Sequence, residues 1–213
     1  MLHMILKREG LVINHKRTER IYREEGLALR RRKRRRRQAH VRGSYPKSTA
    51  PEQSWSMDFM SDSLWRGSRF RLLNIVDDFS RECLAIEVDT SLGGFRVARL
   101  LDRLAMAHKL PDVITVDNGP EFTSKVMDHW AFKNGVKLNF IEPGKPVQNA
   151  IVESFNGRVR EECLNGNWFT SLEEARRILE EWRLDYNQTR PHSSLGHLPP
   201  WEFLEKYKKE MAV

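Results

Sequence analysis

The sequence predicts an α/β protein built on a mixed five-stranded sheet flanked by helices. Strand-like and helix-like patterns alternate from Trp55 onward, which is typical of this class. A basic helical arm precedes that region and a helical tail follows it. The 213 residues are enough to bury one good-sized core. The two cysteines, Cys83 and Cys163, exclude a disulfide framework and a Cys-rich zinc site.

Positive charge is concentrated at the amino-terminal end of the chain. Residues 1–50 hold 16 Lys and Arg against 4 Asp and Glu, a net +12, whereas residues 51–213 hold 21 against 25, a net −4. This asymmetry predicts a body that does chemistry and an arm that holds a polyanion, for which nucleic acid is the obvious candidate. No apolar run reaches the roughly 20 residues of a membrane span, and no signal-peptide pattern is present. We therefore expect a soluble, cytoplasmic protein with no membrane partner.

The amino-terminal arm predicts two short helices followed by a run of cations. The first helix ends at Gly10; the second begins after Asn14, a favourable N-cap, and ends at Gly26. This is the outline of a helix-turn-helix DNA-binding unit, although many soluble proteins contain such a pair. The run that follows is open to three interpretations: a solvated linker, a nuclear-localisation signal or a phosphate-binding tether. Its eight residues are Arg30, Arg31, Arg32, Lys33, Arg34, Arg35, Arg36 and Arg37.

Five strands and two intervening helices are expected between residues 54 and 140. The strands are Ser54–Met60, Phe70–Val76, Cys83–Val88, Val113–Val116 and Val136–Phe140. The turn Asp77–Arg81 joins the second and third strands as a hairpin. One helix follows Gly93-Gly94 and ends before Pro111, and the other spans about Glu121 to Lys133.

Two more helices complete the expected core. One spans about Val147 to Leu164, and its apolar stripe toward the sheet is Val147, Ile151, Phe155 and Val159, each four residues apart. Glu153, Asn156 and Arg160 then fall on another face of this helix. The next helix opens with the capping box Ser171 to Glu174, and the residues that it turns inward are Leu172, Ala175, Leu179 and Trp182.

Three carboxylates have surroundings that are unusual for a solvated surface. Asp58 lies between apolar residues of the first strand, Asp117 ends the fourth strand, and Glu153 lies within a helix. Hard divalent cations prefer carboxylate oxygens, and two such ions can stabilise both the attacking and the leaving oxygen of a phosphoryl displacement. Each of the three acids taken alone is more readily explained as structural. Their order and spacing, with 35 residues between Asp117 and Glu153, favour a shared site.

Other acids compete for the same interpretation. Asp77 and Asp78 are adjacent in the hairpin turn and could mimic a metal pair, but a tight turn uses Asp for local hydrogen bonds equally well. Glu121, four residues after Asp117, could also approach a bound metal. We expect a minor role for it at most.

Linked blocks in a fixed order extend from about Ser54 to Phe203, roughly three quarters of the chain. They are WSMDF, VDDFSRECLA, VDNGPEFTS, GKPVQNAIVESFNGRVREECLN and YNQTRPHSSLGHLPPWEF. In these blocks the chain resembles the catalytic core of bacterial insertion-sequence DDE transposases of the OrfB type, within the retroviral-integrase and RNase H-like superfamily. The resemblance implies an RNase H-like fold. It also implies metal-dependent DNA strand cleavage and transfer of the freed 3′-hydroxyl to target DNA.

The resemblance also implies roles for individual residues. Asp58, Asp117 and Glu153 match the catalytic and metal-binding triad, which would hold two Mg²⁺ or Mn²⁺ ions. Arg160 matches a basic residue that contacts DNA, and Gln148 and Asn156 match polar positions that line the site, where we expect DNA binding. The late segment matches a signature for which we expect contact with DNA ends; its residues are Tyr186, Asn187, Arg190, Pro191 and His192.

The implied organisation has four parts and several partners. We expect a partial helix-turn-helix region in 1–29, a basic linker in 30–50, an integrase-type catalytic core in 51–165 and a helical tail in 166–213. With a DNA substrate implied, DNA contact becomes the favoured interpretation of the Arg run. A homo-oligomer on DNA and an OrfA-type partner are also implied. The family's earlier amino-terminal helices are missing, so a DNA-binding remnant or regulator without transposition activity, or a nuclease that cuts without joining, remains an alternative.

Overall fold

The computed structural model describes residues 2–12, 14–27, 48–142 and 149–212. The Arg run Arg30–Arg37 and Gln148 lie outside these described residues, as does Val147. Within the described ranges, no helix has both the length and the apolar character that crossing a membrane would require.

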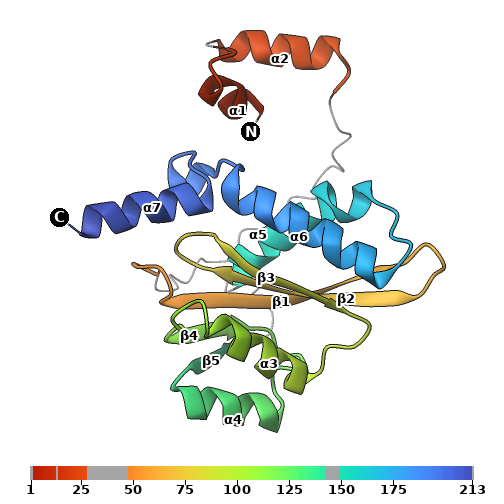
Figure 1. Ribbon diagram of the computed structural model, residues 1–213, viewed down its shortest axis with the longest axis vertical. Helices are drawn as coiled ribbons and strands as arrows, with labels where there is room; N and C mark the ends of the chain where they lie inside the picture. The colour runs from red at the N-terminus through yellow and green to blue at the C-terminus, as the bar shows by residue number, and fades with distance from the viewer. Residues whose placement is uncertain (1, 13, 28–47, 143–148, 213) are drawn as a thin grey trace.

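The body is built on the mixed five-stranded sheet that the sequence predicts (Figure 1). Its strands are β1 (Ser54–Ser63), β2 (Arg69–Asp77), β3 (Cys83–Asp89), β4 (Val113–Val116) and β5 (Lys137–Phe140). They lie in the order β3-β2-β1-β4-β5. The first three form an antiparallel meander, whereas β4 runs parallel to both β1 and β5. This arrangement places β1 at the centre, between the antiparallel and the parallel halves.

Helices cover both faces of the sheet, and each face has its own apolar core. α3 (Gly94–Leu104) and α4 (Lys125–Asn134) pack on one face, over residues that include Trp55, Met57 and Ile75. α5 (Ala150–Glu162) and α6 (Leu172–Gln188) pack on the other, over residues that include Phe70 and Leu72. Alternate residues of a strand point to opposite faces, so one central strand serves both cores.

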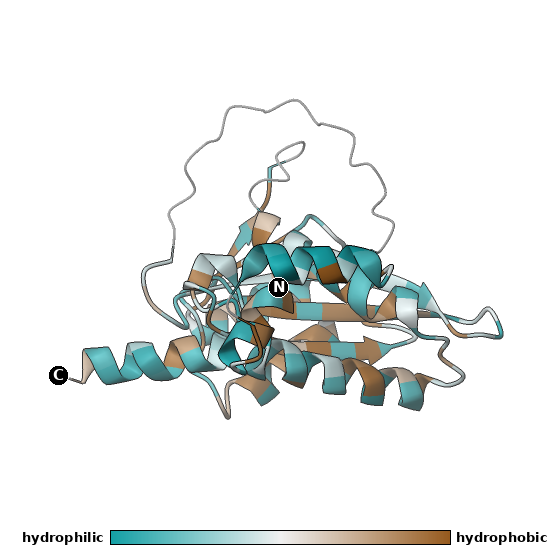
Figure 2. Cartoon of the chain, turned by 90° about the horizontal axis from the view of Figure 1, so that it is seen from above, coloured by the Kyte–Doolittle hydropathy of each residue, from teal (hydrophilic) through white to brown (hydrophobic). Residues whose placement is uncertain are grey.

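The two ends of the chain are helical. α1 (Leu2–Arg8) and α2 (His15–Glu24) form the arm, and α7 (Pro200–Met211) projects from the body (Figures 1 and 2). Single 3₁₀ turns lie at Leu164–Gly166 (η2) and Ser193–Leu195 (η3). Asn14 caps α2 by accepting a hydrogen bond from the Lys16 N–H, as the sequence predicts. Arg8 of the arm pairs with Glu202 of α7.

Two helix starts differ from the sequence prediction for identifiable reasons. α4 begins at Lys125 rather than near Glu121, because the Ser124 hydroxyl accepts the Met127 N–H and makes Ser124 the N-cap. In α5 the described helix begins at Ala150 after the N-cap position Asn149, and it ends at Glu162. These shifts leave Asp117 and Glu153 on the predicted elements.

The inward face of α5 also differs from the four-residue stripe. The buried residues are Val152, Phe155, Asn156 and Val159, whereas Ile151 is only half-buried. A helix repeats every 3.6 residues, so a strict spacing of four drifts away from the buried side. The prediction that Asn156 lies on a separate face with Glu153 and Arg160 is therefore wrong, because Asn156 is buried and the other two are not.

Candidate active site

Asp58 lies in the middle of β1, on the sheet face covered by α5. Its neighbour across the antiparallel pair is Asn74 of β2. The Oδ1 atom of Asp58 accepts the Phe59 N–H at 2.8 Å, and its Oδ2 atom accepts a hydrogen bond from the Asn156 amide at 2.7 Å. Asn156 in turn accepts a hydrogen bond from the Asn74 amide at 2.6 Å. A chain of two buried amides thus fixes the Asp58 carboxylate between β2 and α5.

Asp117 follows β4 directly and is presented by a tight turn. Its Oδ1 atom accepts the Gly119 N–H at 2.9 Å, and the Asn118 amide donates to the Ile141 carbonyl at 2.8 Å. A Cβ atom at position 119 would lie 2.9 Å from the Asp117 Oδ1 atom, so a side chain there would displace the Asp117 carboxylate. The turn therefore ends the strand and holds the carboxylate in place.

The sheet register brings Asp58 and Asp117 together. Ser56 pairs with Thr115 in the parallel β1–β4 ladder. Asp58 and Asp117 each lie two residues beyond that pair, on strands that neighbour each other at about 4.8 Å. Adjacent parallel strands therefore carry the two carboxylates at matching positions and on the same face.

Glu153 approaches from the first turn of α5. The preceding Asn149 is buried, and its amide donates to the Met57 carbonyl of β1 at 3.5 Å, which anchors the start of the helix beside the central strand. Glu153 and Asn156 are three residues apart and so lie on neighbouring parts of the helix surface. The Glu153 side chain is exposed beside the buried Asn156–Asp58 contact.

Asp117 and Glu153 act electrostatically on Asp58. Burial, together with the negative charges of Asp117 and Glu153, raises the pKa of Asp58 to about 6, against the opposing hydrogen bonds from the Phe59 N–H and the Asn156 amide. None of the three forms an ion pair with any residue in the described ranges. Glu121, by contrast, pairs with Arg71, whose guanidinium lies 4.2 Å from the centre of the Phe59 ring. Within the described ranges, the negative charge of the triad therefore has no counter-ion.

The three carboxylates are suitable ligands for a hard divalent cation, but they are not close enough together to bind one ion. Three carboxylates offer the oxygen ligands that Mg²⁺ and Mn²⁺ prefer. Across the described part of the chain, however, no three His, Cys, Asp or Glu side chains lie close enough together to hold one ion. The structure thus places Asp117 and Glu153 within electrostatic range of Asp58, while the three side chains do not form a metal-binding group.

Comparison with known proteins identifies the family. Two models described as integrase core domain match residues 48–146 and 134–200. The chain is 49% identical over 207 residues to the insertion element IS407 uncharacterized 31.7 kDa protein of Burkholderia multivorans, covering 97% of this chain and 75% of that protein. The chain belongs to the integrase-core family of insertion-element transposases. This confirms the family resemblance of the sequence blocks.

A second transposase-family relative and two solved structures agree with this assignment. The chain is 44% identical to the insertion element IS476 uncharacterized 39.2 kDa protein of Xanthomonas euvesicatoria, covering 99% of this chain and 61% of that protein. A chain of the simian T-cell lymphotropic virus intasome, solved with PP2A regulatory subunit B56 gamma, matches with a TM-score of 0.67 at 18% identity, covering 81% of this chain and 61% of that one. The HTLV-2 integrase catalytic core, solved with magnesium, matches with a TM-score of 0.58 at 17% identity, covering 73% of this chain and 97% of that one. These structures confirm the RNase H-like fold.

Arg160 of this transposase core has partners within the protein. Its guanidinium donates to Asp62 at 3.0 Å and to the Ser61 carbonyl at 2.6 Å, and the side chain remains 38% exposed. It therefore holds α5 against the end of β1. The DNA contacts expected of Arg160 and Asn156 stay predictions, and Gln148 lies outside the described residues.

Asn74 completes the amide chain to Asp58 and was not among the residues predicted for the site. Asn74 is fully buried in the middle of a strand whose neighbouring residues are apolar. A buried side-chain amide needs hydrogen-bond partners, so the available signal is the asparagine within the apolar run RLLNIV. Its partner on α5 could not be inferred because a sequence does not show which helix covers a strand.

Proposed function

We propose that this transposase-family core cuts a DNA strand at the ends of an insertion element and joins the freed 3′-hydroxyl to target DNA. The observation that supports this most directly is the group Asp58, Asp117 and Glu153, three neighbouring carboxylates that have no counter-ion among the residues the structure describes. Mutual repulsion of this kind is typical of functional sites, where it prepares for a positively charged ligand.

The proposed cofactor is a pair of Mg²⁺ or Mn²⁺ ions held by these three side chains. Two such ions, when bound, activate the attacking oxygen and stabilise the leaving oxygen of a phosphodiester. The protein's own contribution is to orient the ligands: Asn156 and the Phe59 N–H fix Asp58, and the Gly119 N–H fixes Asp117. In this proposal, convergence of the carboxylates accompanies metal and DNA binding.

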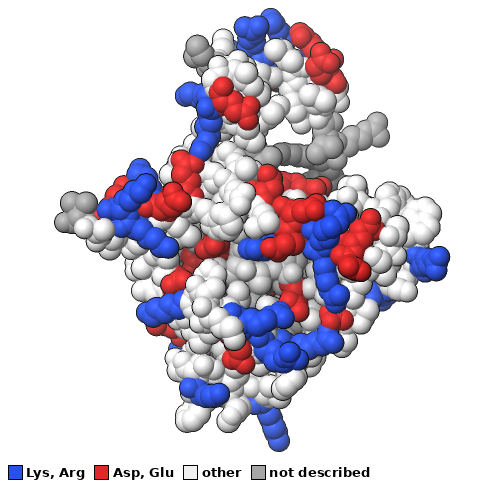
Figure 3. All heavy atoms as spheres, viewed as in Figure 1, with Lys and Arg blue, Asp and Glu red and all other residues white. Residues whose placement is uncertain are grey.

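DNA is the proposed partner, and the charge of the amino-terminal region supports it. The arm and linker in residues 1–50 carry a net charge of +12, enough for salt-sensitive and sequence-neutral contact with phosphates. On the face in Figure 3, Lys and Arg side chains are interspersed with Asp and Glu rather than gathered in one patch. The body would then contact DNA at local sites, such as Arg160 and Asn156 beside the triad. The linker would contact it through Arg30–Arg37.

The proposed organisation keeps the partial helix-turn-helix region in 1–29, the linker in 30–50, the core in 51–165 and the tail in 166–213. Within that tail, α6 packs on the same sheet face as α5, so it supports the core. The solved relatives include an intasome and a trimeric integrase core. A homo-oligomer on DNA, with an OrfA-type partner that recognises the element ends, is proposed for this chain.

The test is a strand-transfer assay with a labelled duplex that carries the element end. With Mg²⁺ or Mn²⁺ the purified protein is expected to yield nicked and joined products, and with EDTA neither. Asp117→Asn serves as the inactive control. DNA binding without any product would instead support a remnant or regulator, and nicking without joining would support a nuclease.

A further inference from the structure

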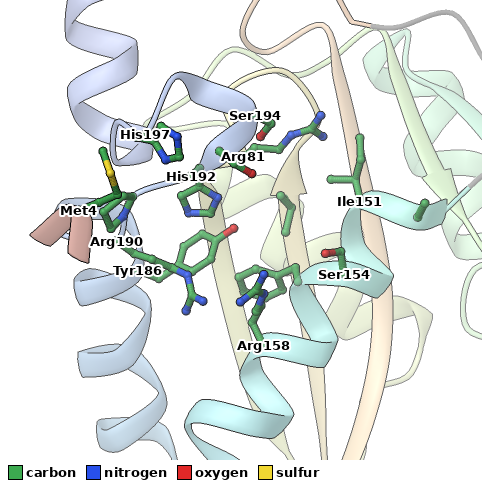
Figure 4. A pocket seen from close by; sticks show the side chains of 15 residues that line it. Met4, Arg81, Ile151, Ser154, Arg158, Tyr186, Arg190, His192, Ser194 and His197 are labelled. Atoms are coloured by element: carbon green, nitrogen blue, oxygen red, sulfur yellow. The ribbon is translucent and has the colours of Figure 1, made fainter. Parts of the chain in front are cut away.

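A second polar site lies beside the triad, in a cavity of about 540 Å³. The cavity is bounded by α5, by the turn between β2 and β3, and by the segment from Tyr186 to His197 (Figure 4). The polar side chains that matter in its lining are Arg81, Ser154, Arg158, Arg190, His192 and Ser194. Ser154 directly follows Glu153 on α5, so the cavity and the triad share one helix.

Positive charge dominates the lining. Three arginines line the cavity and, among the described residues, no Asp or Glu does. Glu162, behind the lining, pairs with Arg190 and lies 3.7 Å from Arg158. Arg81 forms no ion pair with any described residue. Glu162 thus serves two of the three guanidinium groups, and Arg81 has no carboxylate partner among the described residues.

Two polar atoms of the lining are buried without a hydrogen-bond partner in the described ranges. They are the Arg81 Nη1 atom and the His192 Nε2 atom. Most buried polar atoms in proteins are paired. A guanidinium only donates, so the Arg81 atom lacks an acceptor, whereas the His192 atom lacks either an acceptor or a donor, depending on the tautomer. Burial, with the positive charges of Arg190, Arg158 and Arg81, also lowers the pKa of His192 to about 4. An anion in the cavity would give the Arg81 Nη1 atom an acceptor and would offset the positive charges around His192.

The backbone and the aromatic packing hold these groups in place. Arg81 has a φ of 63°, a left-handed conformation that non-glycine residues seldom adopt, and such strain tends to persist at functional sites. Tyr186 is buried and packs edge-on against both Phe155 and His192, with ring centres 5.0 and 4.8 Å apart. The cationic lining therefore rests on a rigid aromatic support.

We infer that this cavity binds a phosphate group of the DNA backbone, next to the phosphodiester that is processed at the triad. The inference rests on the proposed function for its choice of DNA as the source of the phosphate. Arginine forks suit phosphate oxygens, and the serine hydroxyls of Ser154 and Ser194 add neutral donors. The segment Tyr186–His197 thus gains a stated role: it closes a phosphate pocket over α5.

The first experiment measures duplex binding by the full chain in EDTA, where no cleavage occurs. Arg81→Gln and Arg158→Gln are each expected to weaken binding about tenfold and to lower the slope of log K against log salt by about 0.9. Arg99→Gln, an exposed arginine of α3 on the opposite sheet face, is the matched control and should change neither value. Arg81→Lys, which keeps the charge, should recover most of the slope if the folded protein is intact.

The second experiment follows the His192 imidazole by NMR, with inorganic phosphate in one arm and duplex in the other. Both ligands should shift its resonances in the wild type, and Arg81→Gln should abolish both shifts. A phosphate shift with unchanged duplex binding in Arg81→Gln would overturn the DNA assignment, and an Arg81→Gln variant that behaves like Arg99→Gln would overturn the pocket. If Arg81→Gln weakens duplex binding but the wild-type protein does not cleave DNA even with Mg²⁺ or Mn²⁺, the phosphate pocket stands and the proposed catalytic function is refuted.

Discussion

Two groups of acidic side chains lie on the same sheet, and they differ in how their oxygens are used. Asp77 is buried and accepts four hydrogen bonds: from the Glu52, Phe79 and Ser80 N–H groups and from the Ser80 hydroxyl. Asp78 accepts from the hydroxyls of Ser54 and Ser56, both at 2.6 Å. These two carboxylates are satisfied by the protein and serve the turn.

Two of the three triad carboxylates, those of Asp117 and Glu153, accept fewer hydrogen bonds than Asp77 and Asp78 do. Asp58 accepts two hydrogen bonds and Asp117 one, while Glu153 has none with the described residues. Burial does not separate the two groups, because it raises the pKa of Asp78 as well as that of Asp58. Hydrogen bonding does not separate Asp58 from Asp78 either, because each oxygen of both carboxylates has a donor. The difference lies in Asp117 and Glu153, which accept one hydrogen bond and none from the described residues.

Removing one carboxylate of the triad should have the largest effect. Asp58→Asn, Asp117→Asn and Glu153→Gln should each lower strand cleavage about a thousandfold or more, because metal ligation supplies several kcal/mol of transition-state stabilisation. The assay is cleavage of the labelled element end, with circular dichroism to show that each variant is folded. A variant that keeps near-normal activity would remove that residue from the triad.

Removing the Asp77 carboxylate should lower stability rather than activity. Asp77→Ala leaves several donors unpaired, two of them on Ser80, and is expected to destabilise the protein by about 2–4 kcal/mol. Chemical denaturation measures the loss. Below the melting temperature this variant should still cleave DNA, so selective loss of activity in a stably folded variant would contradict the assignment.

Disturbing the orientation of Asp58 should have an intermediate effect. Asn156→Ala removes the amide donor while leaving all three carboxylates, and is expected to weaken metal affinity about 10- to 100-fold, as partners of metal ligands do. The signature is a shifted Mn²⁺ dependence of cleavage, with activity recovered at high Mn²⁺. Loss that Mn²⁺ does not restore would indicate another role for Asn156.

The smallest expected effect is on the pH dependence of stability in EDTA. The folded pKa of Asp58 is raised, from 3.8 to about 6, so its favourable contribution is present below pH 4 and is lost as the pH rises through 6. Asp58→Asn escapes this cost and should be about 1–3 kcal/mol more stable than wild type at pH 8, with the difference shrinking toward pH 4. Equal differences in stability at both pH values would show that burial and the neighbouring charges do not raise the pKa of Asp58.

Much of this comparison could be predicted from local sequence. Asn14, the strand patterns and the turn after Asp117 each act through nearby residues, and the structure agrees with them. The amide chain from Asn74 through Asn156 could not be predicted, because it depends on which helix face meets which strand. The cavity around Arg81 needs three segments distant in sequence, and its left-handed φ has no clear sequence signal.

Anomalous diffraction from Mn²⁺ in crystals of the protein bound to the element end tests the metal site most directly. Manganese is expected between Asp58 and Asp117, with Glu153 drawn in and metal–oxygen distances of about 2.0–2.3 Å. Manganese bound at Asp77 and Asp78, or no manganese near Asp58 although DNA is bound, would contradict this expectation.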